Sequence, residues 1–412
     1  MISLLKDKLF PNIVDKGVFG EGQRFLWFKE DNKQVGEDQL QSTVVFGTLA
    51  VSDGQQYQLV IKFNFAEPKA IEIFNTDIQF ENEIIMYKDI IPFLMSYSED
   101  VTNGLPLLPR FFYGAKKNED ALVDNDVIIL ENMRSLGFRL SEERVFIGFD
   151  HISAGLQAIA KFHASSYIAK HNDFTQFQNK IVGIRDHSWK SNDRWTIPEK
   201  ALRALAFRGI DRLLQRSPEK YRDHVHLKQF IALVDNFYKN LRSTMVPRQP
   251  HAVICHGDLC RNNILFRYDH SGHPTDALLF DVASPQYGSP VLDLSFFLYL
   301  NTDKELRESR WGELLDVYHS RLSTSVPKNV RIPSRSELDS EMASYAFYGY
   351  SCVSHFLVYM VDENPLPVTE LIEMPEEKCL EYRLRVGGDT GTELLADVIQ
   401  HIVDMGYTNI VL

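Results

Sequence analysis

The sequence predicts an α+β protein with a β-rich N-terminal part and a large helical C-terminal part. Two β-branched, apolar segments, 43–51 and 57–63, flank a Ser-Asp-Gly turn and predict a hairpin. Farther along the chain, apolar residues recur at helical spacing over long stretches. Strands and helices therefore do not alternate as they do in a doubly wound parallel sheet. We expect two lobes, a β-rich lobe with the hinge over 1–132 and a helical lobe over 133–412.

The other elements are predicted from the spacing of apolar residues. A helix over 76–91 is expected to end at Pro92, because proline lacks a backbone N–H donor. The sequence Thr-Gly-Thr-Glu at 390–393 predicts a capping box at the start of the last helix. The remaining expected elements are a strand at 127–130, helices at 152–170, 199–214 and 225–242, and strands at 263–266 and 277–280.

Charge and composition exclude several classes of protein. In the 412-residue chain, 44 Lys and Arg oppose 56 Asp and Glu, for a formal charge of −12. A negative body gains nothing from counterion release, so we expect neither nucleic acid nor an anionic membrane as a partner. No apolar run of about 18 residues predicts a membrane span, and the first residues are too charged for a signal peptide. Few cysteines favour a reduced, cytoplasmic protein, and no obligate protein partner is evident.

The strongest functional signal is His-Gly-Asp-x-x-x-x-Asn at 256–263, followed by a predicted hairpin and Asp281. Phosphoryl transfer needs a carboxylate that accepts the substrate hydroxyl proton and oxygen ligands that hold Mg²⁺ on the phosphates. This order of residues supplies both, as in kinases. We interpret Asp258 as the catalytic base, Asn263 and Asp281 as Mg²⁺ ligands, and His256 as a residue that orients the loop. A chance sequence in a capped loop is the weaker alternative.

The N-terminal part offers the matching lysine and glutamate. A kinase uses a strand lysine to reach the phosphates and a helix glutamate to hold that lysine. Lys62 ends a predicted strand, and Glu83 falls within the apolar arc of the following helix, whereas Glu81 falls outside it. A buried carboxylate needs a partner, so we expect Glu83 to pair with Lys62. The alternative is an ordinary surface lysine and an unrelated glutamate.

The phosphate-covering loop is the least defined part of the expected site. No G-x-x-x-x-G-K-[ST] sequence occurs, which excludes a P-loop. The segment 34–42 directly precedes the first strand of the hairpin, where such a loop belongs. Gly36 would allow close approach of the backbone, and Ser42 could donate a hydrogen bond. A simple turn is the alternative.

Together these motifs resemble the ecdysteroid kinase-like (choline-kinase-like) family of insects, within the aminoglycoside phosphotransferase superfamily. The resemblance implies a protein-kinase-like two-lobed fold and phosphorylation of a small-molecule hydroxyl with ATP and Mg²⁺. It also implies that Glu131 and Met133 lie in the hinge that binds adenine, and that Asp293 braces the catalytic loop. The residues that carry it are the Lys62 strand, Phe80-x-x-Glu83-x-x-x-Tyr87, Leu130–Met133 with Gly137-Phe138, Ala160–Ser166, His256–Phe266 and Tyr287–Leu294.

Two departures leave the acceptor open. Cys260 stands where the family often has an aromatic residue, and Val282-Ala283 stands where it usually has Phe-Gln. Neither position holds metal or a proton, so we expect activity to be retained. An ecdysteroid or related lipophilic alcohol is the first expectation, with choline, ethanolamine or a xenobiotic alcohol as rivals. A nucleotide-binding pseudokinase is the alternative of another class, and the intact site residues argue against it.

Further helical segments bear on the acceptor. About 120 residues separate the hinge from the catalytic loop, more than a peptide kinase would need. We expect this helical insert to build an acceptor pocket; extra stability alone is the alternative. The aromatic stretch 345–350 could line such a pocket, although packing in the core is favoured. His163, on an expected helix, is interpreted as a hydrogen-bonded structural residue.

Overall fold

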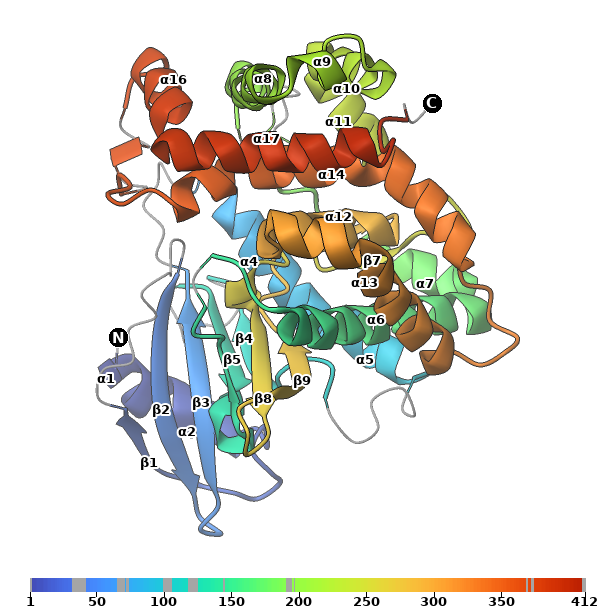
Figure 1. The fold of residues 1–412 in the computed structure, drawn as a ribbon. Helices are drawn as coiled ribbons and strands as arrows, with labels where there is room; N and C mark the ends of the chain where they lie inside the picture. The colour runs from blue at the N-terminus through green and yellow to red at the C-terminus, as the bar shows by residue number, and fades with distance from the viewer. Residues whose placement is uncertain are drawn as a thin grey trace.

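The computed structural model places a β-sheet at one end of the molecule and a large group of helices at the other (Figure 1). The expected α+β class, with a β-rich N-terminal part and a large helical C-terminal part, is confirmed. The lobe boundary between residues 132 and 133 stays a prediction. The structure describes residues 2–31, 42–64, 71, 74–98, 106–117, 125–143, 145–189, 195, 197–367, 370–371 and 374–409.

The N-terminal sheet has five antiparallel strands in the order β1-β2-β3-β5-β4. β2 and β3 pair from Thr43 opposite Phe63 to Ala50 opposite Gln56, which confirms the predicted hairpin. β5 confirms the strand expected at 127–130, and it lies beside β3. The strands are β1 (Phe25–Glu30), β2 (Thr43–Val51), β3 (Gln56–Phe63), β4 (Phe111–Ala115) and β5 (Val127–Glu131).

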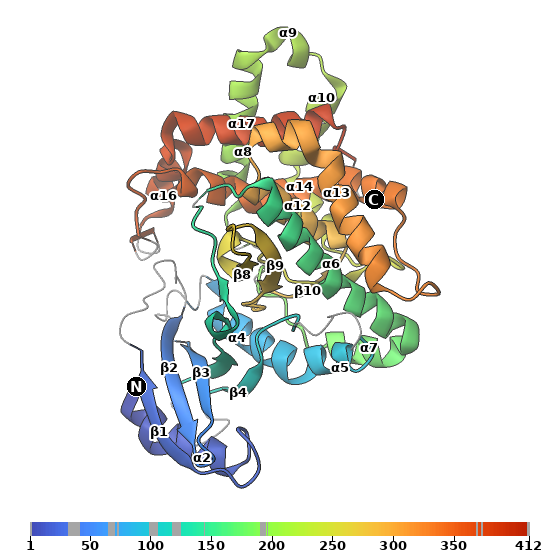
Figure 2. The ribbon, with the colours of Figure 1, turned by 60° about the horizontal axis from the view of Figure 1, so that its bottom comes forward.

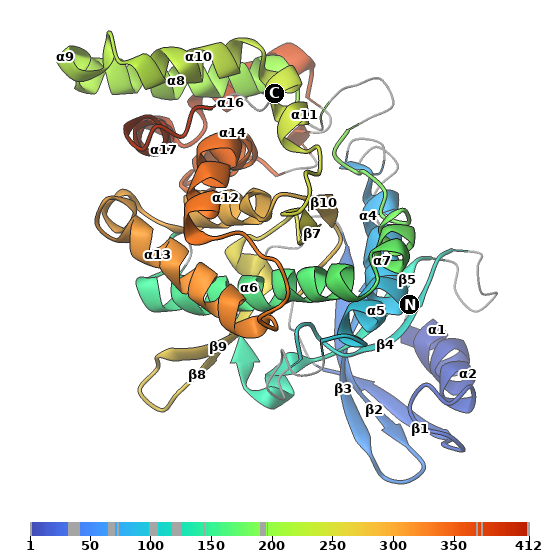
Figure 3. The same cartoon turned by 90° about the vertical axis from the view of Figure 1, so that its right-hand side faces the viewer.

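Helical residues before the sheet were not predicted. They form α1 (Ile2–Leu4), a π-helical turn (Leu5–Leu9) and α2 (Phe10–Asp15), beside β1 in Figure 3. The ring of Phe10 lies 4.7 Å from that of Phe28 on β1, and both are buried. The segment therefore covers one face of the sheet, and its helical state depends on this contact more than on its own short sequence.

The helix after β3 does not end at Pro92, so that expectation is wrong. α4 (Thr76–Ile85) continues through a π-helical turn (Met86–Ile90) into α5 (Ile91–Met95). The wider turn puts Pro92 in the first turn of α5, where the missing N–H of proline breaks no helical hydrogen bond.

Two small sheets lie between the N-terminal sheet and the helices (Figure 2). β8 (Ile264–Tyr268) and β9 (Pro274–Leu279) confirm the second predicted hairpin, and β6 (Phe138–Arg139) pairs with β8. β7 (Val253–Cys255) pairs with β10 (Gln286–Gly288). The residues between β7 and β8 and those between β9 and β10 therefore lie close together.

Helices form the rest of the C-terminal part. The expected helices at 152–170 and 199–214 are confirmed as α6 and α8, but the one at 225–242 is divided at Asn236 into α10 and α11. α12 is buried along its whole length and packs against α14. The helices are α6 (Phe149–Asn172), α7 (Phe174–Ile181), α8 (Glu199–Arg216), α9 (Pro218–Tyr221), α10 (Val225–Asp235), α11 (Phe237–Thr244), α12 (Pro290–Asn301), α13 (Lys304–Ser325), α14 (Arg335–Met360), α16 (Glu376–Arg385) and α17 (Gly388–Asp404).

The capping box predicted at 390–393 is wrong. α17 begins at Gly388, and no side chain caps it. The carboxylate of Glu393 instead forms ion pairs with Arg212 and Arg216 of α8. Gly387 precedes the helix at a φ of 72°, where glycine is favoured, and its N–H donates to Asp362.

The aromatic stretch 345–350 packs in the core, as favoured from the sequence. Tyr345, Phe347 and Tyr350 are buried in the main apolar cluster of the molecule. No helix in the part of the chain that the structure describes has the length and apolar character needed to cross a bilayer.

Candidate active site

Lys62 lies between two carboxylates that come from distant parts of the chain. Its Nζ is 2.6 Å from Glu83 Oε2 on α4 and 2.6 Å from Asp281 Oδ1, two residues after the end of β9. Burial alone would lower the pKa of Lys62, but the charges of Asp281 and Glu83 outweigh it and hold that pKa above its usual value. Lys62 is therefore a fixed cation at the centre of the site.

Glu83 is the glutamate that holds the lysine. The predicted pairing of Lys62 with Glu83 is confirmed, and the Glu83 side chain is only 1 % exposed. Burial raises its pKa to about 7, against the opposing charge of Lys62. Glu81 instead pairs with Lys116 at 2.7 Å and Arg185 at 2.6 Å, away from Lys62. The apolar arc of the helix thus distinguished the two glutamates correctly.

Asp258 is held by the side chain of Asn263. Asn263 Nδ2 donates to the backbone oxygen of Asp258 at 2.9 Å and to its Oδ2 at 3.0 Å. Burial raises the pKa of Asp258, and the negative charge of Asp281 raises it further. Two carboxylates that repel each other across a small space favour a cation between them.

The donor atoms at this place suit a hard cation. The carboxylate of Asp281 is partly exposed and uses one oxygen for Lys62. The amide nitrogen of Asn263 points to Asp258, which leaves the amide oxygen as its possible metal ligand. Mg²⁺ prefers such oxygen ligands and is commonly shared between carboxylates and phosphates. The residues therefore fit the ion that the sequence predicted, and their role as ligands stays a prediction.

His256 links the two loops of the site. Its Nε2 lies 2.9 Å from the carbonyl oxygen of Phe280, the residue before Asp281. A carbonyl can only accept, so Nε2 carries the proton and Nδ1 accepts from the backbone N–H of Asp258 at 3.4 Å. The imidazole thus sets the distance between the residues proposed as base and metal ligand.

The backbone on both sides of the site is tightly constrained. Asp281 has a φ of 61°, a conformation that residues other than glycine rarely adopt. Gly257 has a φ of 82°, and a Cβ there would lie 1.8 Å from the carbonyl oxygen of Ser284. Only glycine allows this close approach of the two loops. The need for glycine at position 257 could not be predicted from the sequence, because Ser284 is 27 positions away along the chain.

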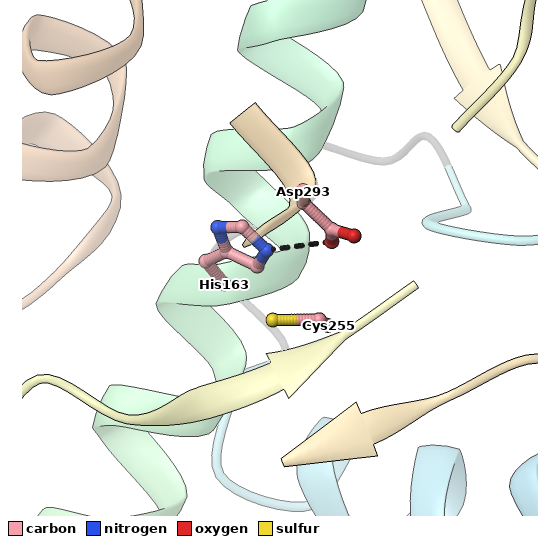
Figure 4. A group of neighbouring side chains, drawn as sticks. All are labelled: His163, Cys255 and Asp293. Atoms are coloured by element: carbon pink, nitrogen blue, oxygen red, sulfur yellow. Dashed lines mark hydrogen bonds and ion pairs between the residues drawn. The ribbon is translucent and has the colours of Figure 1, made fainter. Parts of the chain in front are cut away.

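Asp293 on α12 holds the start of the catalytic loop. Its Oδ2 accepts from the backbone N–H of His256 at 2.7 Å, and its Oδ1 accepts from that of Gly257 at 2.9 Å. His163 on α6 lies 3.0 Å from the same carboxylate, as Figure 4 shows. These bonds are the bracing that the resemblance implied for Asp293.

The group His163, Cys255 and Asp293 has the spacing of a metal site but is fully used in hydrogen bonding. His163 Nδ1 lies 2.8 Å from the Tyr318 hydroxyl, and Nε2 bonds Asp293. The Cys255 thiol donates to the carbonyl oxygen of Ser289 at 3.3 Å. The interpretation of His163 as a hydrogen-bonded structural residue is confirmed.

Ser42, Glu131 and Met133 lie at or near the ends of the interior strands β2 and β5. Glu131 ends β5, and its N–H donates to the backbone oxygen of Arg110 at 2.8 Å. Met133, two residues later, is buried. Ser42 directly precedes β2 and is half-buried. Gly36 lies outside the described residues. The nucleotide contacts expected of these four residues stay predictions.

Residues of α14 reach the catalytic loop, which the sequence did not predict. Burial raises the pKa of Cys352 to about 12, and the nearby charge of Asp258 contributes to the rise. Gln286 Nε2 donates to the hydroxyl of Tyr348 at 2.6 Å. Tyr348 belongs to the aromatic stretch that suggested a pocket, whereas Gln286 and Cys352 gave no such signal. These neutral side chains therefore lie near the catalytic loop, with Tyr348 buried in the core.

The sequence profile of the ecdysteroid kinase-like family matches residues 42–329, more than two thirds of the chain. The chain belongs to the ecdysteroid kinase-like family. The match includes all the site residues described above, from Lys62 to Asp293, but ends before α14. As a member of this family, the protein is a small-molecule phosphotransferase.

Solved structures of small-molecule kinases are similar to this ecdysteroid kinase-like protein at low identity. A microcompartment-associated aminopropanol kinase is 14 % identical, with 92 % of this chain and 94 % of that chain covered and a TM-score of 0.43. Amicoumacin kinase hAmiN, in complex with AMP-PNP and Ca²⁺, is 12 % identical, with 88 % of each chain covered and a TM-score of 0.39. The ADP-bound aminoglycoside phosphotransferase APH(2'')-Ib is 12 % identical, with 93 % and 95 % covered and a TM-score of 0.32. The family assignment does not depend on these structures, and no curated protein sequence matches the chain.

Proposed function

We propose that the protein transfers the γ-phosphate of ATP, in the presence of Mg²⁺, to a hydroxyl group of a lipophilic alcohol such as an ecdysteroid. One observation carries the proposal: Lys62 Nζ contacts both Glu83 and Asp281 at 2.6 Å, beside Asp258. Phosphoryl transfer depends on positioning and charge stabilisation more than on covalent chemistry. A fixed cation next to a base and oxygen ligands supplies that environment.

Each residue then has a distinct task. Lys62 binds the phosphates, and Glu83 keeps its ammonium group in place. Asn263 and Asp281 would hold Mg²⁺, which when bound neutralises the phosphate oxygens. Asp258 accepts the proton of the acceptor hydroxyl while the hydroxyl oxygen bonds to the γ-phosphorus and ADP leaves.

The backbone groups of Glu131 and Met133 would bind adenine, and the segment with Gly36 and Ser42 would cover the phosphates. These two roles follow the family resemblance and, for Ser42, Glu131 and Met133, their places next to β2 and β5. We place the reaction in the cytoplasm, where the few cysteines stay reduced.

The neutral side chains near the catalytic loop favour an uncharged acceptor in this proposal. Tyr348, Cys352 and Gln286 offer aromatic surface, a thiol and an amide, none of which carries a charge at neutral pH. Such a surface suits an apolar body with a few hydroxyl groups. A quaternary ammonium acceptor, as in choline, would need an aromatic cage, and Tyr348 could contribute one ring to it. Choline and ethanolamine should therefore be tested as acceptors as well.

Transfer of labelled γ-phosphate to a panel of ecdysteroids, choline, ethanolamine and xenobiotic alcohols tests the proposal, with products identified by mass spectrometry. We expect a phosphorylated steroid with the wild-type protein and none with Asp258→Asn. Phosphorylated choline would support the assignment as a kinase but contradict a steroid as the acceptor. Binding of Mg-ATP without transfer to any acceptor would instead support a pseudokinase.

A further inference from the structure

Helices α13, α14 and α17 lie on the side of the helical part away from the N-terminal sheet (Figure 3), and a cavity lies between them. Its volume is about 560 Å³, within the range of small-molecule sites. None of its lining residues belongs to the candidate active site. Among the residues that line it are Lys220, Arg307, Trp311, His401, Met405 and Tyr407.

Arg307 is a buried cation without a carboxylate partner. Its side chain belongs to the largest fully buried ones, and the residue is 2 % exposed. One guanidinium nitrogen, Nη1, donates to the backbone oxygen of Thr302, but Nε has no hydrogen-bond partner. Among the residues that the structure describes, no ion pair joins Arg307 to an acidic side chain. A buried charge is stable only when it is paired, so this guanidinium is suited to an incoming anion.

The nearest acidic groups are already bound elsewhere. Asp397 pairs with Arg216 at 2.6 Å and with Lys304 at 3.3 Å. Glu308 accepts from Gln400 at 3.2 Å. These acids therefore form no ion pair with the guanidinium. Their negative charges only partly offset the lowering of the Arg307 pKa by burial.

His401 also lines the cavity and contains a second buried polar atom without a hydrogen-bond partner. The residue is 7 % exposed, its Nδ1 lies 3.2 Å from the hydroxyl of Tyr299, and its Nε2 has no hydrogen-bond partner. Burial, together with the charge of Arg307, lowers the pKa of His401 to about 3, so the imidazole is neutral. When the Tyr299 hydroxyl donates to Nδ1, Nε2 carries the proton and can donate to a ligand.

Aromatic side chains complete the cavity. The ring of Trp311 lies 4.3 Å from that of His401, and Trp311 Nε1 donates to the hydroxyl of Tyr407 at 3.1 Å. At the rim, Lys220 is already paired with Asp404 at 2.8 Å. Arg335 and Asp339, which also line the cavity, form a second ion pair, whereas Arg307 has no ion pair with an acidic side chain among the described residues.

We propose that this cavity binds a small organic anion, whose oxyanion group accepts hydrogen bonds from Arg307 Nε and His401 Nε2 while its apolar part lies against Trp311. A carboxylate and a phosphate monoester share this chemistry, since both offer two oxygens to a guanidinium. The site is independent of phosphoryl transfer, because it shares no residue with the catalytic loop.

Calorimetric titration of the full chain with benzoate and with inorganic phosphate, at constant ionic strength, tests the proposal. We expect saturable binding of at least one probe, with a change in tryptophan fluorescence that Trp311→Phe removes. Arg307→Met should weaken binding about tenfold or more, as the loss of a charge-assisted hydrogen bond predicts. Arg310→Met is the matched control on the same helix, because Arg310 pairs with Glu313 outside the cavity; its affinity should equal that of the wild type.

The two probes separate the sources of the anion. Tighter binding of benzoate indicates a carboxylate ligand, and tighter binding of phosphate indicates a phosphate ester. Where Arg307→Met fails to fold by circular dichroism, His401→Asn takes its place and should weaken binding severalfold. The absence of saturable binding by both probes, or equal affinity in the wild type and the cavity variants, would overturn the proposal.

Discussion

Lys62 Nζ lies 2.6 Å from Asp281 Oδ1, although 219 residues separate the two in the sequence. The contact joins strand β3 of the N-terminal sheet to the loop after β9, so it forms only when both parts of the fold are in place. Asp281 reaches it with a φ of 61°, a strained conformation for a residue other than glycine. Such strain persists where the surrounding structure enforces it, and it is concentrated at functional sites.

Replacing Asp258 by asparagine should remove transfer and leave nucleotide binding nearly intact. The amide cannot accept the hydroxyl proton, so kcat should fall by a factor of about 10² to 10⁴. Its oxygen can still accept from Asn263, and burial disfavours the charge that the variant removes, so the Tm should stay equal or rise. Steady-state kinetics and a Mg-ATP thermal shift measure both effects. Asp269→Asn, in the exposed β8–β9 turn, is the control, and unchanged turnover of Asp258→Asn would refute the assignment of the base.

The two glutamates of α4 should respond differently to the same substitution. Glu83→Gln removes the buried charge that holds Lys62, so kcat/KM for ATP should fall about tenfold or more. Glu81→Gln breaks only partly exposed pairs with Lys116 and Arg185, which contribute little. Kinetics of both variants against ATP test this prediction. Equal losses in the two variants would mean that the Lys62–Glu83 pair has no special role.

Gly257 and Gly272 provide a matched test of the close approach between loops. Both have a positive φ, 82° and 83°, but a Cβ at Gly257 would meet the Ser284 carbonyl, whereas one at Gly272 would meet nothing within 4 Å. Gly272→Ala should therefore cost only the ~1–2 kcal/mol of the left-handed conformation. Gly257→Ala should cost clearly more and also abolish turnover, because the catalytic loop must move. Urea unfolding and activity assays compare them; similar losses in both would contradict the contact.

The rate should depend on pH through Asp258. Burial and the charge of Asp281 raise the pKa of this carboxyl above its usual value. The base must be unprotonated, so kcat/KM should fall as the pH drops through the raised pKa. We expect the midpoint of this acidic limb above pH ~4, the usual aspartate value. A pH profile of kcat/KM, with circular dichroism to verify folding at each pH, measures it, and a midpoint at or below that value would contradict the prediction.

Local patterns predicted the residues of the site better than its surroundings. The pairing of Lys62 with Glu83 followed from helical periodicity and the cost of burying a lone carboxylate. The end of a helix at Pro92 was predicted wrongly, because a π-helical turn changes which N–H groups are needed. The hydrogen bond from Gln286 to Tyr348 joins segments far apart in the sequence, and no local rule predicts it. Glu393 likewise forms ion pairs with Arg212 and Arg216, which are distant in the sequence, and not the expected capping box.

Asp293 should be needed to keep the catalytic loop in place. Its two oxygens accept from the backbone N–H groups of His256 and Gly257, and it also bonds His163. Asparagine offers one oxygen and one NH₂ group, so one backbone donor would face another donor. We expect Asp293→Asn to lose ~1–3 kcal/mol of unfolding free energy, as for a buried donor left unpaired, together with a fall in kcat.

Asp303→Asn is the matched control for this change. Asp303 caps α13 by accepting from the N–H of Leu306, and asparagine caps a helix about as well as aspartate. Its stability and kcat should therefore stay near those of the wild type. Urea unfolding and steady-state kinetics on both variants decide the matter: a stable, fully active Asp293→Asn protein would show that the catalytic loop keeps its conformation without the carboxylate.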